Sequence, residues 1–165
     1  MHGMGHSMNR FKHLLVHLDL QGAHDRSAVR YASAVSQLGR SRRIEFIHTV
    51  PAQAVFAGLL NDSSARTTAW AQERYREFLG AIDLGGLEAT FICRESPLVG
   101  PGILRQAGDQ RSDLIVMGAR GKDALSAALL GSTTAEVVRE TRIPTLVVKA
   151  KGAGRSFLEL LLGNP

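Results

Sequence analysis

Short apolar runs alternate with longer segments of helical periodicity along this chain. The apolar runs are bounded by Gly, Pro or polar residues, as strands are. They predict strands over Phe11–Leu20, Ile44–Val50, Leu87–Arg94, Asp113–Gly118 and Thr145–Lys149. Apolar residues that recur at helical spacing predict helices over Asp25–Leu38, Ser64–Ile82, Gly102–Asp109 and Gly131–Arg142.

Strict alternation of strands and helices predicts the fold class. The first and fourth runs are apolar at nearly every position, which is typical of parallel strands covered by helices on both faces. Right-handed crossovers between such strands predict an α/β, doubly wound parallel sheet of five strands. Ligands of these sheets bind beyond the carboxyl ends of the strands, where the winding direction reverses. We therefore expect the functional site after Leu20 and after Gly118.

One predicted helix carries an aromatic stripe. Trp70, Arg74, Phe78 and Ile82 recur four residues apart, and this spacing is more typical of a core-facing stripe than of a cofactor site. The preceding segment, Ala52 to Ser64, has no regular period and is interpreted as a loop.

Length and composition predict one domain in a reducing compartment. A chain of 165 residues with 44% hydrophobic and 21% charged residues has room for one core. We predict a domain over residues 11–150, a flexible tail over 1–10 and an apolar tail over 151–165. The absence of a signal-like or membrane-length apolar run predicts a cytoplasmic location. The single cysteine, Cys93, lies in an apolar run and is interpreted as a buried hydrophobic residue.

The charge pattern does not favour nucleic acid or a membrane as a partner. The formal net charge is +5, but the basic residues are scattered and aromatic residues make up only 5% of the chain. Neither a basic helix nor a stacking platform is formed by this pattern.

A glycine motif follows the fourth predicted strand. Gly118, Gly121, Gly131 and Ser132 satisfy the spacing G-x2-G-x9-G-[ST]. Glycine allows the backbone to turn tightly and to approach a phosphate closely. The helix that follows begins near Ser132, Thr133 and Thr134, where free N–H groups and the helix dipole favour an anion. Ordinary turn glycines and an N-cap serine are the alternative interpretation.

This motif, between a strand and a helix, resembles that of the universal stress proteins, in particular their ATP-binding branch. The resemblance covers about residues 11–149. It implies a five-stranded parallel sheet of order 3-2-1-4-5 and a site for ATP or ADP, with Mg²⁺. Members of this family often form homodimers through the fifth strand, here Thr145 to Lys149.

The resemblance also implies which residues bind the nucleotide. Asp19 matches the aspartate that faces the adenosine, Thr49 matches the residue next to adenine, and Met117 and Gly118 match the ribose side. The full set of predicted binding residues is His17, Leu18, Asp19, Thr49, Met117, Gly118, Arg120, Gly121, Lys122, Gly131, Ser132, Thr133 and Thr134. Thr49 departs from the aliphatic residue that the family usually has, and Glu95–Ser96–Pro97 replaces its Gly-x-Pro turn.

No catalytic or resident metal site is predicted. The chain lacks both the P-loop pattern GxxxxGK[ST] and the metal-binding pattern HExxH. We therefore favour an ATP-binding regulatory module of the stress response with an unknown downstream partner. Two alternatives stay open, a nucleotide-free interaction module of the same fold and a slow ATP-hydrolysing enzyme.

Overall fold

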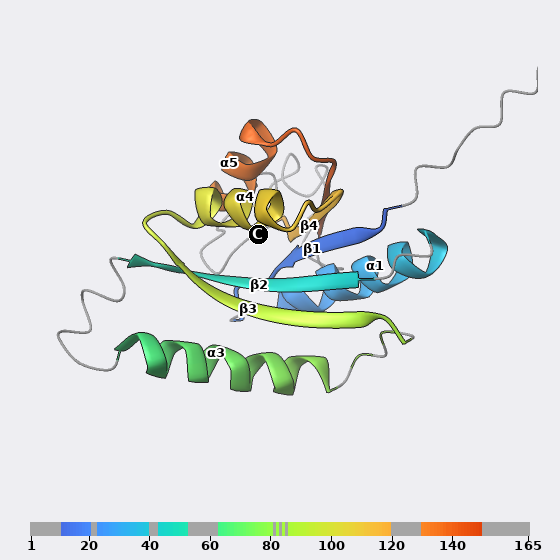
Figure 1. Ribbon diagram of the computed structural model, residues 1–165. Coiled ribbons are helices and arrows are strands. Elements are labelled where there is room, and N and C mark those ends of the chain that lie inside the picture. The colour runs from blue at the N-terminus through green and yellow to red at the C-terminus, as the bar shows by residue number, and fades with distance from the viewer. Residues whose placement is uncertain are drawn as a thin grey trace, which may run out of the picture.

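All five predicted strands lie in one parallel sheet of order β3-β2-β1-β4-β5, in a computed structural model of the chain (Figure 1). The predicted fold class and strand order are confirmed. The structure describes residues 11–20, 23–39, 43–52, 63–80, 82, 84, 86–119 and 130–149. The strands are β1 His13–His17, β2 Arg43–Pro51, β3 Glu88–Ser96, β4 Leu114–Gly118 and β5 Thr145–Val148, and the helices within these ranges are α1 Ala23–Gly39, α3 Ser63–Leu79, α4 Val99–Asp109 and α5 Ser132–Glu140.

Helices cover both faces of the sheet, α1 and α3 on one and α4 and α5 on the other (Figure 1). Side chains alternate between the faces along β2: Phe46 lies in the core beneath α1 and α3, and Ile47 in the core beneath α4 and α5. Both are fully buried. Burial of each such side chain contributes about 1.5–3 kcal/mol, so two buried cores explain why the strands are so apolar.

Several element boundaries differ from the predicted ones. Helix α4 begins at Val99 rather than Gly102, because Pro101 falls in its first turn, where a missing N–H disturbs no intrahelical bond. Strand β1 covers only His13–His17. Strand β3 extends to Ser96, which pairs with Pro51 at the end of β2. The predicted tails, and most of the predicted loop before α3, lie outside the described residues.

The prediction that Trp70 faces the core is wrong. Trp70 is 42% exposed, and Arg74 is paired with Glu77 on the surface. A four-residue spacing drifts around a helix by about 40° per step, so a stripe of this kind leaves the buried face. The core-facing residues of α3 include Ala71, Tyr75, Phe78 and Leu79, and Ile82 packs against the same cluster.

Cys93 packs partly buried against the core beneath α1 and α3. Burial raises the pKa of its thiol, a hydrogen bond with Thr68 opposes the shift, and Glu95 adds to it. A raised pKa keeps the thiol protonated and poorly nucleophilic, in agreement with the predicted structural role.

Helix α4 approaches the ends of β2 and β3 very closely at Gly102. A Cβ atom there would lie 2.7 Å from Thr49 Cγ2 and 2.8 Å from Ser96 Cβ. Ser96 Cβ is bonded directly to the backbone, and Thr49 Cγ2 could move only by a change of the χ1 rotamer of a buried, β-branched side chain. At Gly100 a Cβ would instead meet the flexible carboxylate of Glu136, 2.2 Å away. Gly102 therefore sets the distance between α4 and the sheet.

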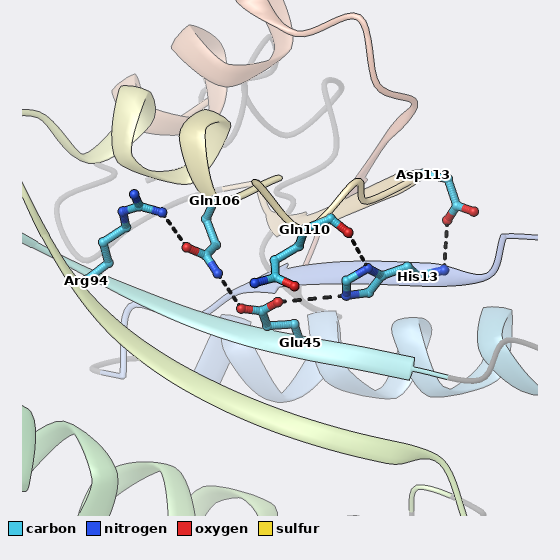
Figure 2. Close-up of polar contacts among 6 residues, drawn as sticks. All are labelled: His13, Glu45, Arg94, Gln106, Gln110 and Asp113. Atoms are coloured by element: carbon cyan, nitrogen blue, oxygen red, sulfur yellow. Dashed lines mark hydrogen bonds and ion pairs between the residues drawn. The ribbon is translucent and has the colours of Figure 1, made fainter. Parts of the chain in front are cut away.

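A buried polar network anchors α4 at the opposite, amino-terminal end of β2 (Figure 2). Glu45 is 3% exposed, and its carboxylate accepts a hydrogen bond from Gln106 Nε2. Gln106, itself 2% exposed, accepts a hydrogen bond from Arg94, which also bonds Asp109 at 3.0 Å. The amide of Gln106 pairs with one carboxylate oxygen of Glu45, whereas the other oxygen, Oε2, has no hydrogen-bond partner within the described residues. Loss of the Gln106 bond would leave the whole buried carboxylate without a donor, which is strongly destabilising.

His13 extends this network to β1 (Figure 2). Its Nδ1 lies 2.8 Å from the carbonyl oxygen of Gln110, which only accepts, so Nδ1 donates. Its Nε2 lies 3.8 Å from Glu45 Oε2. The backbone N–H of His13 donates to Asp113 Oδ1 at 3.0 Å. Three strands, α4 and the turn after α4 are thus joined beneath one face of the sheet.

Candidate functional site

The turn after β1 is fixed by β2. The N–H of Leu18 donates to the carbonyl of Ile47 at 2.9 Å, and its own carbonyl lies 2.9 Å from His48 Nδ1. Two residues later, Leu20 has a φ of 59° and a buried side chain. The left-handed region is unfavourable for leucine, so burial and these bonds hold Leu20 in a strained conformation. Asp19 lies between the two anchored residues.

The end of β4 is joined directly to the start of α5. The N–H of Gly131 donates to the carbonyl of Ala119 at 2.9 Å, and the Thr134 hydroxyl donates to the carbonyl of Gly118 at 2.9 Å. Gly131 is the N-cap residue of α5. Two segments thirteen positions apart in the sequence, at Gly118–Ala119 and Gly131–Thr134, are therefore joined at the carboxyl end of β4. Since β1 and β4 are paired, this is also the place where the winding of the sheet reverses.

Two predicted site residues lie near the carboxyl ends of the strands that flank β1, Thr49 in β2 and Met117 in β4. Both are almost fully buried, at 4% and 1% exposure. Met117 packs in the core beneath α4 and α5, and Thr49 Cγ2 faces Gly102. The Thr49 hydroxyl has no hydrogen-bond partner within the described part of the chain. A buried hydroxyl of this kind is a feature that a bound polar ligand can satisfy.

Two histidines lie beside Asp19 and stay neutral at pH 7. Burial, reinforced by the nearby His48, lowers the pKa of His17 to about 4, and Asp19 opposes the shift. Burial also lowers the pKa of His48, against the hydrogen bond with the Leu18 carbonyl and the charge of Asp19. Both imidazoles therefore present neutral nitrogen atoms rather than cations near this turn.

The predicted residues take different positions at this site. The ends of β1 and β4 and the start of α5 bring Asp19, Gly118 and Gly131 to the same end of the sheet. Ser132 is exposed and Thr133 partly exposed at the start of α5, whereas the Thr134 hydroxyl is already bonded to Gly118. Arg120, Gly121 and Lys122 lie outside the described residues.

Sequence reasoning missed two features of this region. The strain at Leu20 has no signal in the sequence, because leucine rarely takes a positive φ. Trp70 also lies here, with its ring centre 5.9 Å from that of His48 in an edge-on arrangement. A histidine at the end of an otherwise apolar strand was the available signal for this contact.

Neither a metal-binding cluster nor a membrane-spanning helix is found within the described residues. No three side chains of His, Cys, Asp or Glu there are grouped so that they could hold a metal ion. None of the helices in those ranges combines the length and apolar character that a bilayer span requires.

A parallel sheet whose winding reverses between β1 and β4, with helices on both faces, defines the doubly wound class of α/β proteins. Within this class, the model of the universal stress protein family matches residues 10–149. The chain belongs to the universal stress protein family.

Two curated relatives share shorter stretches with this chain. Universal stress protein MJ0577 of Methanocaldococcus jannaschii is 43% identical over 51 residues, which is 31% of this chain and 32% of the relative. The universal stress protein in the QAH/OAS sulfhydrylase 3'region of Thermus aquaticus is 40% identical over 84 residues, 48% of this chain and 61% of the relative. The chain thus spans less than two thirds of either relative.

Solved structures show the same fold over most of the chain. The structure of MJ0577 has a TM-score of 0.74 at 24% identity and covers 87% of this chain and 99% of its own. A universal stress protein in complex with cAMP has a TM-score of 0.58 at 18% identity, and the match covers 86% of this chain and 99% of that protein. A universal stress protein from Archaeoglobus fulgidus in complex with dAMP has a TM-score of 0.56 at 17% identity, and the match covers 85% of this chain and 99% of that protein.

Proposed function

We propose that the chain is a cytoplasmic, adenine-nucleotide-binding regulatory protein of the stress response, with ATP or ADP, accompanied by Mg²⁺, as its ligand. The observation that carries the proposal is the junction of Gly118 and Gly131 beside the strained turn that holds Asp19. Complexes of similar universal stress proteins with cAMP and dAMP support the same ligand class.

The start of α5 fits a phosphate group. The first N–H groups of a helix have no intrahelical partner, and here no side chain caps them. The first turn of α5 has no acidic residue that would repel an anion. Together with the helix dipole, the N–H groups of Ser132 and Thr133 would bind phosphate oxygens, and the exposed Ser132 hydroxyl would add a further donor.

The remaining parts of the nucleotide fit the other strand ends. Asp19 would accept hydrogen bonds from ribose hydroxyls, and the Thr49 hydroxyl would pair with a polar edge of the base. Bound nucleotide state, rather than turnover, is the proposed output, because no general base can be assigned for the attack of water on a phosphate.

Asp19→Ala is expected to weaken ATP binding about tenfold, as one lost charged hydrogen bond costs about 1–2 kcal/mol. Isothermal titration of the purified chain with Mg²⁺–ATP measures the affinity, after any co-purified nucleotide has been identified by denaturation. The matched control is Glu140→Ala, an exposed carboxylate at the other end of α5. No detectable binding by the unaltered chain refutes the proposed function, and equal affinity of Asp19→Ala refutes the role of Asp19.

A homodimer through β5 is the second part of the proposal. Strand β5 is an edge strand, and the carbonyls of Pro144 and Val148 accept hydrogen bonds from Ile115 of β4 and from Ala119, the residue after β4. Because backbone groups alternate in direction along a parallel strand, those of Val147 point to the open edge. An edge of this kind, flanked by apolar side chains, can pair with its copy around a twofold axis.

Val147→Pro is therefore expected to convert dimer to monomer without disturbing the β4–β5 ladder, because proline removes an outward-facing donor. Sedimentation velocity at micromolar concentration measures the change, with Val147→Thr as the control that keeps the N–H group. A monomeric unaltered chain, or a dimer that survives the proline, would rule out this interface.

A further inference from the structure

The turn that carries Asp19 owes its shape to one side chain of β2. The regular pairing of β1 with β2 ends at His17 and Ile47. Beyond it, the Leu18 N–H continues the ladder to Ile47, but the Leu18 carbonyl lies 2.9 Å from a side-chain nitrogen, Nδ1 of His48. The imidazole replaces the next backbone donor at the point where β1 leaves the sheet.

The chemistry of this contact fixes the state of His48. A carbonyl oxygen only accepts, so Nδ1 carries the proton in the neutral and in the charged ring. The ring is 8% exposed and stands edge-on to Trp70. Its orientation is therefore set by two contacts, one to the turn after β1 and one to α3.

Asp19 follows the anchored carbonyl directly, and Leu20 follows with a φ of 59°. The charge of Asp19 opposes the lowering of the pKa of both His17 and His48 by burial. If the Leu18 carbonyl were released, the strained Leu20 would have one anchor fewer and Asp19 would lose its fixed direction.

We infer that His48 is a positioning residue of the nucleotide site: its Nδ1–H group holds the Leu18 carbonyl, and thereby the Asp19 carboxylate, in the geometry that binds ribose. The inference rests on the proposed function. It assigns His48 no contact with the ligand and explains why a buried histidine lies within an apolar strand, just beyond the last β1–β2 pair.

The test compares His48→Leu with His48→Asn in the full chain. Asparagine places an amide N–H group near the position of Nδ1, whereas leucine offers none. We expect about a tenfold weaker binding of Mg²⁺–ATP for His48→Leu and recovery to within about threefold of wild type for His48→Asn. Urea unfolding of each variant separates loss of binding from loss of fold.

A double-mutant cycle with Asp19→Ala makes the test specific. If His48 acts through Asp19, His48→Leu has no further effect in the Asp19→Ala background. Equal affinity of His48→Leu and wild type, or an undiminished effect in that background, overturns the positioning role while leaving the proposed function intact. A wild-type chain that binds no adenine nucleotide overturns both.

Discussion

Gln106→Leu is expected to lower the free energy of unfolding by about 3 kcal/mol, the upper end of the cost of leaving a buried acceptor without its hydrogen-bond donor, because the acceptor here is a carboxylate. The amide of Gln106 donates to the Glu45 carboxylate and accepts from Arg94. Leucine has a similar volume and neither group, so a buried charge loses its hydrogen bond. Urea-induced unfolding at pH 7, with the m-value compared between variants, measures the loss.

Two controls show whether the charge is responsible. Arg94→Met should cost far less, because Arg94 is partly exposed and Glu45 keeps its bond to Gln106. The double variant Glu45→Leu, Gln106→Leu should recover most of the stability, since no buried carboxylate is left. A double variant as unstable as Gln106→Leu would indicate that packing beneath α4, rather than charge, explains the loss.

Acid is expected to destabilise the fold through His17. The folded-state pKa is about 4, below the usual 6.5, so the folded protein binds fewer protons than the unfolded chain between these values. Stability is therefore retained above pH 6.5 and falls as the pH drops toward 4. His17 alone accounts for about 2–3 kcal/mol of this fall, at about 1.4 kcal/mol for each unit of pKa difference.

His17→Gln removes this proton linkage and keeps a polar side chain of comparable reach. Between pH 7 and pH 4, wild type should lose about 2–3 kcal/mol more unfolding free energy than His17→Gln does. The difference between the two curves removes the contribution of groups that titrate independently of His17. A difference that does not change with pH would show that His17 is protonated equally in both states.

The architecture could be predicted because it depends on patterns that extend over whole elements. Apolar runs located all five strands, and helical spacing located the four described helices, so that only the ends of elements differ. Helix α4, for example, begins at Val99, because a proline in a first turn resembles a helix break in the sequence. Trp70 shows the limit of such reasoning, because the rotation of a helix against a sheet is decided by the packing of all its residues together.

The candidate site could be predicted only in its backbone parts. The glycine spacing placed Gly118 and Gly131 correctly at one end of the sheet, since strand and helix must join there. The network of Glu45 and Gln106 was not predicted, because polar residues within apolar patterns do not indicate their partners. The bond between His48 and Leu18 likewise joins residues thirty positions apart that only the register of β1 and β2 brings together.

The two halves of the sheet differ in how firmly they are paired. Strands β2 and β3 are bonded along all nine residues of each, whereas β5 has four residues and closes the other edge alone. Transient local opening is therefore expected to begin in the half that contains β5 and α5, where amide hydrogens should exchange fastest. A ligand held at the start of α5 would slow that opening, so occupancy would alter the motion of one half of the molecule without altering its average fold.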